Sequence, residues 1–494
     1  DFSAKFVLNH ARQLLQEPSN LTELYGLGIT EDEVSTKVSE FTPFLAEWGT
    51  KYFVAEPHPI HGAIDFKEGG ASKSMGDSRV ALCVSQVLDI EECVWSPKFG
   101  LKGQIDSSIE VKINRSPNIM RKNSSLNQTC VLPLELKTGK CYTKLGSVEH
   151  RAQVILYTLM MMERYDRTLD TGLLLYLKTG HMLGVPAHKH EKRALVMKRN
   201  ELVRYLSHAG TRLVQSMPGM LQDEHNCKYC PQLNVCAMYH RSVEKGDCKS
   251  AGMGNLFDKS TSHLSPVHLK YFSHWNELIA LESKAMQENA SDCDIWCLSG
   301  TEREQLGYCF SKMFLVSCCA AEEPGRYLNK FRKEDLKSSQ ICAADVHFAK
   351  GDYIVVSQED GVMALATGFL KEICEESISV LLDKDLTRCY HHRRCSENQL
   401  YRIDKAEIST GATIQWSNLA KLFFADSEEH AKLRRLIVDL QSPKFSRENE
   451  MISSISSSQV SGAWSSQLSS CSMTSPMKSS QGDNELTQIL QDLN

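Results

Sequence analysis

Residues 100–157 constrain the fold of this 494-residue chain more than any other stretch. Residues 100–113 (GLKGQIDSSIEVKI) alternate like a β-strand, and residues 131–140 (VLPLELKTGK) contain a shorter apolar strand. Residues 147–160 (SVEHRAQVILYTLM) have the periodicity of an amphipathic helix, and residues 173–186 form a strand pattern that turns at a Thr-Gly pair. Strands and a helix in this order predict an α/β fold, a mixed sheet flanked by helices.

Five side chains in this stretch form a candidate catalytic set. Glu135 and Lys137 are two apart on a strand and so share a face, and Asp106 stands beside them if the two strands pair. Gln153 and Tyr157 are four apart on the helix and also share a face. An exposed charged hairpin would explain Glu-x-Lys alone. The whole ordered set favours Asp106 and Glu135 as ligands of Mg²⁺ or Mn²⁺, with Lys137 orienting a water for phosphodiester hydrolysis.

The same residues carry a resemblance to a known family. Gly-x-Ile-Asp106, Glu135-Leu-Lys137 and Gln153-x-x-x-Tyr157 are similar to the motifs of RecB-like nucleases in the PD-(D/E)xK superfamily. The phrases FGLKGQID, LPLELKTGK and EHRAQVILYTL resemble the nuclease part of the eukaryotic DNA replication helicase/nucleases, across most of residues 20–450.

The resemblance implies a PD-(D/E)xK core followed by a small β-barrel and further helices. It implies metal-dependent endonuclease activity on single-stranded and flap DNA in replication and repair. It also implies single-strand-binding protein and replication or repair factors as partners, and a location in the nucleus, with the mitochondrion as a second compartment. No G-x-x-x-x-G-K-[ST] phosphate loop occurs in the sequence, so we assign no ATPase to this chain, although a full-length relative would be an ATP-dependent helicase.

Two other functions are compatible with the sequence. The family's catalytic histidine, which lies on a helix upstream of the nuclease core, is not found here, so the chain could be a catalytically incomplete DNA-binding or scaffolding module. The motifs are also compatible with a nuclease that acts on RNA. We expect the chain to be a fragment, since it begins with Asp1 and has neither Met nor a signal-peptide pattern at its start. Because the phosphate loop is absent, we expect this fragment to lack the helicase motor.

Three cysteines with the spacing C-x₂-C-x₅-C, namely Cys227, Cys230 and Cys236, suggest a metal centre. The resemblance implies a [4Fe–4S] cluster whose fourth cysteine would lie upstream of the core, and we find no such cysteine in this chain. Zinc is an alternative, and plain buried cysteines are another. The candidates for a fourth zinc ligand are His225, His240 and Cys248.

The net charge of −5 by itself argues against nucleic acid, but charge is unevenly distributed. Residues 98–151 contain ten Lys or Arg and four Asp or Glu, a local net of +6. Because salt screens charges beyond about 8–10 Å, a phosphate responds mainly to this local patch. No apolar run reaches the ~18 residues that a membrane helix needs, so we expect no membrane partner.

Composition and periodicity divide the chain into successive segments. Residues 1–56 are predicted to be helical, with Thr30 opening a long helix through a capping box and residues 33–53 forming one helical pattern. The predicted boundaries are 1–250 for the nuclease domain with its cysteine cluster, 251–305 for a helical linker, 306–410 for a β-barrel, 411–446 for helices, 447–483 for a disordered Ser-rich segment and 484–494 for the start of the absent motor.

Overall fold

The computed structural model divides into two compact units, Asp1–Ala431 and Lys432–Asn494. None of the helices among the described residues is long and apolar enough to cross a membrane. Part of the basic stretch 98–151, including Arg115, Arg121 and Lys122, and all residues after 443 lie outside the described residues. The described residues are 3–65, 79–114, 127–141, 143, 145–209, 218–289, 292–323, 325–333, 347–389, 391, 399–406, 410–425 and 427–443.

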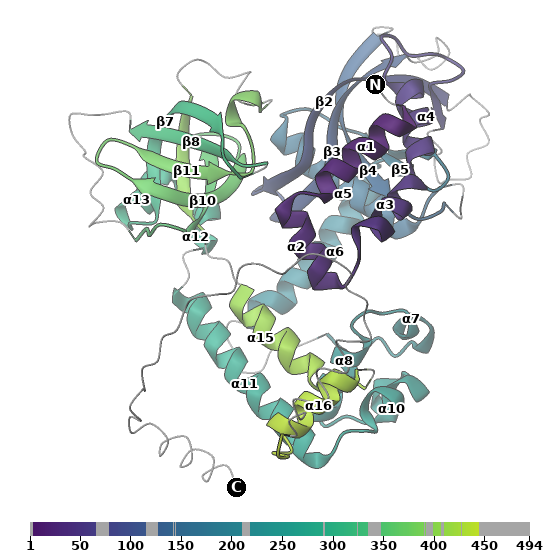
Figure 1. Ribbon diagram of the computed structural model, residues 1–494, viewed down its shortest axis with the longest axis vertical. Helices are drawn as coiled ribbons and strands as arrows, with labels where there is room; N and C mark the ends of the chain where they lie inside the picture. The colour runs from purple at the N-terminus through teal and green to yellow at the C-terminus, as the bar shows by residue number, and fades with distance from the viewer. Residues whose placement is uncertain are drawn as a thin grey trace, which may run out of the picture. The chain divides into compact units, whose positions relative to one another are not determined.

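A six-stranded mixed sheet forms the first layer of the larger unit (Figure 1). Its strands follow sequence order, and every neighbouring pair is antiparallel except β4 and β5, which are parallel. The helix α5 (Val148–Arg164) connects these two, as parallel pairing requires a crossover. The predicted mixed sheet flanked by helices is therefore confirmed. The strands are β1 (Ala63–Asp65), β2 (Arg79–Ser96), β3 (Leu101–Asn114), β4 (Asn127–Lys137), β5 (Thr171–Tyr176) and β6 (His181–Pro186).

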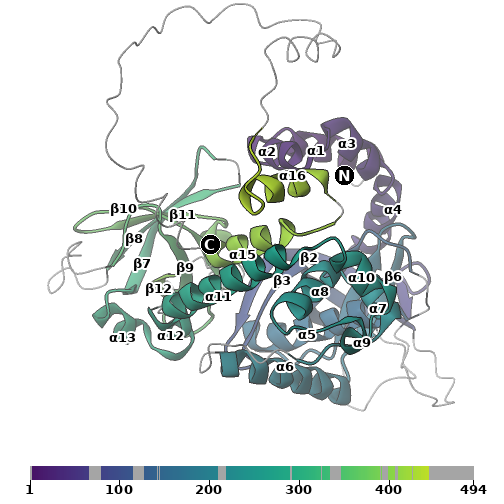
Figure 2. The ribbon, with the colours of Figure 1, turned by 90° about the horizontal axis from the view of Figure 1, so that it is seen from below.

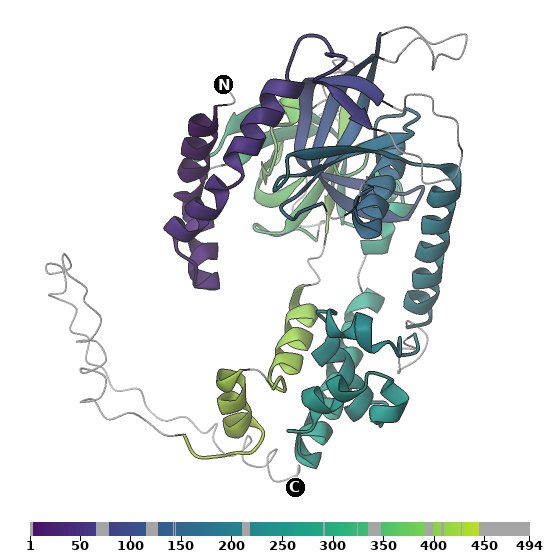
Figure 3. The ribbon, with the colours of Figure 1, turned by 90° about the vertical axis from the view of Figure 1, so that its right-hand side faces the viewer.

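Four short helices precede the sheet, as predicted for residues 1–56: α1 (Ala4–Leu15), α2 (Pro18–Leu27), α3 (Glu31–Ser39) and α4 (Thr42–Tyr52) (Figure 3). The capping box is confirmed, because Thr30 Oγ1 accepts from Glu33 N at 3.3 Å and Glu33 Oε2 accepts from Thr30 N at 2.9 Å. The single helix predicted over 33–53 is wrong. The helix α3 ends at Ser39, and a new helix, α4, begins at Thr42. Pro43 lies in the first turn of α4, where its missing N–H is tolerated, whereas inside a continuous helix it would break a hydrogen bond.

The core of the sheet is built from apolar side chains that strands, α4 and α5 contribute together. Trp48 of α4 donates from its indole N–H to Met182 Sδ at 3.2 Å, which fixes the N-terminal helices against β6. Ser147 caps α5 by accepting from His150 N at 3.2 Å, so the helix begins where the sequence pattern placed it. After β6 the chain continues into the long helix α6 (Lys189–Ala209).

A closed six-stranded barrel follows further along the chain, in the order β10-β11-β8-β7-β12-β9 (Figure 1). Its interior is apolar, and side chains such as Met313, Phe331 and Val380 have no exposed surface. Gly368 is required, since a Cβ there would lie 1.9 Å from the carbonyl oxygen of Leu381. The strands are β7 (Cys309–Ala320), β8 (Tyr327–Lys333), β9 (Tyr353–Gln358), β10 (Ala366–Ile373), β11 (Ile378–Leu382) and β12 (Leu400–Lys405).

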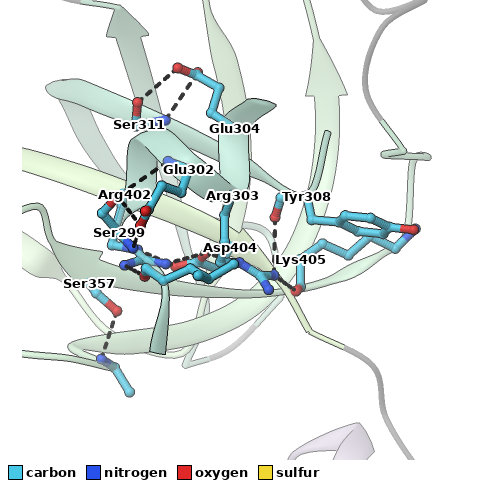
Figure 4. A network of polar contacts seen from close by, with 12 residues as sticks. Ser299, Glu302, Arg303, Glu304, Tyr308, Ser311, Ser357, Arg402, Asp404 and Lys405 are labelled. Atoms are coloured by element: carbon cyan, nitrogen blue, oxygen red, sulfur yellow. Dashed lines mark hydrogen bonds and ion pairs between the residues drawn. The ribbon is translucent and has the colours of Figure 1, made fainter. Parts of the chain in front are cut away.

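Charged side chains form a buried network of hydrogen bonds and ion pairs in the barrel region (Figure 4). Asp404 has no exposed surface and receives hydrogen bonds from Arg303 Nε at 2.8 Å and Arg402 Nε at 2.7 Å. Arg303 also donates to the carbonyl oxygens of Tyr308 (3.4 Å) and Lys405 (3.1 Å). The barrel strands β7 and β12 are thereby tied to the preceding helix α13 (Gly300–Gln305).

Helices make up the rest of the described chain. The long helix α11 (Pro266–Asn289) and α15 (Thr410–Lys421) lie side by side, as Figure 2 shows. Phe272 of α11 and Phe423 have no exposed surface and pack edge to face. Residues 411–446 are predicted to be helical, and the structure has α15 and α16 (Glu428–Ile437) in this segment. The short helices are α7 (Glu224–Lys228), α8 (Leu233–Ser242), α9 (Cys248–Ala251), α10 (Asn255–Thr261) and α12 (Asp292–Cys297).

Candidate active site

Four of the five predicted side chains lie in one hydrogen-bonded chain. The ammonium group of Lys137 donates to Glu135 on the same strand and to Gln153 Oε1 on α5 at 2.9 Å. Gln153 in turn donates to the Tyr157 hydroxyl at 2.9 Å, and that hydroxyl donates to the carbonyl oxygen of Gln104 at 2.6 Å. This series of hydrogen bonds joins Lys137, at the end of β4, to Gln153 on α5 and through Tyr157 to β3. It therefore holds the lysine in place.

Asp106, the fifth residue, joins the group through the backbone. Its Oδ2 accepts from the N–H of Leu136 at 2.7 Å, the residue between Glu135 and Lys137. The pairing of β3 with β4 begins at Ser107, opposite Leu134, so Asp106 directly precedes the paired segment of β3. Its carboxylate satisfies a backbone donor next to the two charged residues of β4.

Glu135 has the feature that points most clearly to a ligand. Its side chain is 98% buried, and its Oε2 has no hydrogen-bond partner. Burial raises the pKa of this carboxyl group, and the nearby charge of Asp106 raises it further, against the lowering effect of Lys137. A buried carboxylate oxygen without a partner is unfavourable, and a bound cation removes the penalty. The site therefore fits a hard divalent cation.

The donor set matches the coordination habit of magnesium. No group of three or more His, Cys, Asp or Glu side chains within the described ranges is arranged to hold a metal ion. Asp106 and Glu135 would therefore supply two ligands, and waters or substrate oxygens would supply the rest. Mg²⁺ is usually bound in this way, by one or two carboxylates with several retained waters.

Sequence reasoning missed Tyr176, at the end of β5. Its hydroxyl accepts from Ser147 N at 3.1 Å and lies 2.9 Å from Nδ1 of His150. Burial lowers the pKa of His150, and the charge of Lys137 lowers it further. The imidazole is thus held at the N-terminus of α5 by a tyrosine. No local pattern singled out Tyr176, because its role depends on the parallel pairing of β4 with β5.

The three cysteines of the C-x₂-C-x₅-C motif lie around the turn between α7 and α8. Cys227 is partly buried, whereas Cys230 and Cys236 are exposed. Although Cys236 as a residue is exposed, burial around its thiol raises the pKa of that group, and the charges of Cys227 and Cys230 raise it further. Cys236 Sγ contacts Met220 Sδ at 3.6 Å. The described residues do not form a complete metal-ligand group here.

The proposed fourth zinc ligands are engaged elsewhere or exposed. Both ring nitrogens of His240 have partners, Glu244 at Nδ1 and Ser250 Oγ at Nε2 (2.9 Å). Cys248 donates to the carbonyl oxygen of Gly254 at 3.3 Å. His225 is exposed, and its ring lies against Tyr229.

Comparisons with known proteins agree with this architecture. The family model described as "DNA replication factor Dna2" matches residues 1–111, and the model of the Dna2 Rift barrel domain matches residues 300–407, which contain the barrel. The chain is 35% identical over 446 residues to the Xenopus laevis DNA replication ATP-dependent helicase/nuclease DNA2, and 34% identical over 450 residues to the human protein of that name. A relative from Arabidopsis thaliana, the helicase/nuclease JHS1, is 30% identical over 449 residues.

These alignments cover most of this chain but less than half of each relative. They include 88% of the chain and 40% of the Xenopus and human proteins, and 86% of the chain and 32% of the Arabidopsis protein. The region of similarity contains the sheet, the candidate site and the barrel. The chain therefore belongs to the Dna2 family of DNA replication helicase/nucleases.

Proposed function

We propose that this chain is a metal-dependent nuclease that cleaves single-stranded and flap DNA. The observation that carries the proposal is the buried, unpartnered Oε2 of Glu135, which lies beside Lys137 and one residue from the backbone N–H that Asp106 accepts. A carboxylate in that state is suited to a cation, and a lysine fixed next to it is suited to a phosphate or an attacking water. The names of the relatives, which combine helicase, nuclease and DNA replication, support DNA as the substrate.

Each residue of the site has a distinct proposed role. Asp106 and Glu135 would hold Mg²⁺ or Mn²⁺, which stabilises the negative charge that develops on the phosphate. Lys137 would orient the attacking water and offset charge on the pentavalent phosphate. Gln153 holds the lysine ammonium group, and Tyr157 holds Gln153 while being anchored on the carbonyl of Gln104. The PD-(D/E)xK assignment of the core rests on this arrangement.

The cysteine cluster is proposed to bind a [4Fe–4S] cluster through Cys227, Cys230 and Cys236. The position of the three cysteines around the turn between α7 and α8 supports this assignment. Two of the three candidate fourth zinc ligands, His240 and Cys248, are engaged in other contacts. Iron, acid-labile sulfide and zinc should be measured on the purified chain. Iron with sulfide supports the cluster, whereas stoichiometric zinc without iron would overturn it.

Cleavage of a labelled 5′-flap DNA in Mg²⁺ tests the main proposal. We expect cleavage by the wild-type chain and none by Glu135→Ala, while both chains bind the DNA. An all-ribose flap in parallel separates DNA from RNA specificity. DNA binding by the wild type without cleavage in Mg²⁺ or Mn²⁺ would contradict the nuclease and support the alternative, a DNA-binding or scaffolding module.

A further inference from the structure

Glu91 of β2 lies on the strand next to the one that carries Asp106. In the pairing of β2 with β3, Ile90 is opposite Ser107 and Glu92 is opposite Ile105, so Glu91 is level with Asp106 on the neighbouring strand. Its influence also reaches α5. Burial is the main cause of the raised pKa of Tyr157, and the charges of Glu135, Asp106 and Glu91 raise it further. Strand register and electrostatics thus both place this glutamate at the edge of the candidate site.

The backbone at Glu91 is unusual for a residue inside a strand. Its φ is +50°, in the left-handed region that residues with a Cβ adopt with strain. Strain of this kind persists where the surrounding structure requires it, and it is concentrated at functional sites. The side chain of Glu91 is exposed, and no hydrogen bond or ion pair of its carboxylate occurs within the described part of the chain.

The negative charges of Glu135, Asp106 and Glu91 all act on Tyr157, whereas Lys137 is the ammonium group that hydrogen-bonds within the site. An excess of carboxylates would repel a phosphate unless cationic charge is bound among them. The described residues contain no group of three side chains close enough to ligate one ion, so Glu91 is not a direct ligand together with Asp106 and Glu135. A carboxylate at that remove can accept hydrogen bonds from waters on the ion, of which Mg²⁺ keeps several.

We propose that Glu91 is a positioning residue of the catalytic centre, which orients the water molecules of a divalent cation held by Asp106 and Glu135. This inference rests on the proposed function and extends it, because it adds an acidic residue from a third strand. Residues that orient the ligands of a metal typically contribute 10- to 100-fold to its affinity. Glu91 would do so from β2, while the two ligands belong to β3 and β4.

The test measures Mn²⁺ binding to the full chain by calorimetry, without DNA. Mn²⁺ suits the same oxygen ligands as Mg²⁺. We expect Glu91→Gln to raise the Kd for Mn²⁺ about tenfold or more. Glu372→Gln is the matched control, since it makes the same change at an exposed glutamate on strand β10, and it should leave the Kd unchanged.

A second variant separates a functional role from a structural one. Glu91→Gly removes the carboxylate and relieves the positive φ, so it should weaken Mn²⁺ binding while its Tm in metal-free buffer equals or exceeds that of the wild type. Wild-type Mn²⁺ affinity in both Glu91 variants would overturn this inference alone. If the wild type binds no Mn²⁺, or if Asp106→Asn binds it as well as the wild type, the proposed metal site itself is wrong.

Discussion

Arg164 and Glu92 form an ion pair with 3.1 Å between Nε and Oε1, and both side chains are 2% exposed. The same guanidinium donates to the carbonyl oxygens of Met363 (2.5 Å) and Ala364 (3.3 Å), just before barrel strand β10. Glu92 also accepts from the Tyr165 hydroxyl at 2.9 Å. The pair thus connects β2 of the sheet, the end of α5 and the barrel through one buried network.

Glu92→Gln should destabilise the chain strongly. The substitution leaves Arg164 buried without its counter-ion, and breaking a buried ion pair in this way typically costs about 3–5 kcal/mol. Urea denaturation measures the change in the free energy of unfolding. Lys198 and Glu201 form an exposed ion pair on α6, and Glu201→Gln is the control that should change stability by about 1 kcal/mol or less. Equal effects of the two substitutions would contradict the structural role of the buried pair.

The same carboxylate predicts a pH dependence of stability. Burial raises the pKa of Glu92, but the charge of Arg164 and the hydrogen bonds from Ser108 and Tyr165 outweigh burial and hold it below the usual value of 4.5. A carboxyl group with a depressed pKa stabilises the fold above its unfolded pKa, and this contribution is lost as the pH falls through the folded pKa. The stability difference between the wild type and Glu92→Gln should therefore shrink below about pH 4.5. A constant difference throughout acid titration would refute this.

Lys137→Ala should reduce cleavage far more than DNA binding. Loss of one group that stabilises transition-state charge typically costs ~10²–10³ in rate. Single-turnover cleavage of a flap DNA gives the rate, and fluorescence anisotropy gives the affinity. Lys140→Ala, at an exposed lysine three residues further along the chain, is the control and should leave the rate nearly unchanged. Equal losses of rate and affinity in Lys137→Ala would argue against its proposed role.

Tyr157→Phe should have a smaller effect on cleavage than Lys137→Ala. It removes the hydroxyl that links Gln153 to the carbonyl oxygen of Gln104, but it leaves the contact between Gln153 and Lys137. Loss of one such hydrogen bond typically costs about 0.5–1.5 kcal/mol, so we expect a decrease of roughly threefold to tenfold in single-turnover rate. Gln153→Ala removes the direct contact with the lysine and should cost more. The reverse order would show that the tyrosine acts on the substrate itself.

Asp404→Asn should destabilise the barrel, because it leaves Arg303 and Arg402 buried with no negative charge between them. We expect a loss of about 3–5 kcal/mol, measured by chemical denaturation. Asp352→Asn is the comparison, since Asp352 pairs with Lys405 at a site that is about one-fifth exposed, and its effect should be clearly smaller. A neutral effect of Asp404→Asn would mean that the two arginines find other partners.

Local pattern was sufficient for the elements that carry the candidate site. The alternation of residues 101–113 and the spacing of Gln153 and Tyr157 each belong to one element, so strand and helix periodicity predicted them. Sequence periodicity gave wrong or missing predictions where a proline interrupts a helical pattern and where charged residues lie inside the protein. Residues 33–53 kept helical periodicity through a proline that divides them, and β8 and β12 were not predicted. In β12 the charged residues Arg402 and Asp404 are buried. In the sequence, however, they look like the solvent-facing residues of an exposed strand.

The sequence by itself determined which chemical groups are present and how they are spaced along each strand and helix, since that spacing fixes which side chains of one element point together. The tertiary structure alone decided which groups are buried and which strands are neighbours. It left one oxygen of Glu135 buried without a partner, enclosed Asp404 between two arginines, and set Glu91 level with Asp106 on the neighbouring strand. These relationships depend on contacts between residues far apart in the chain, and local periodicity contains no information about them.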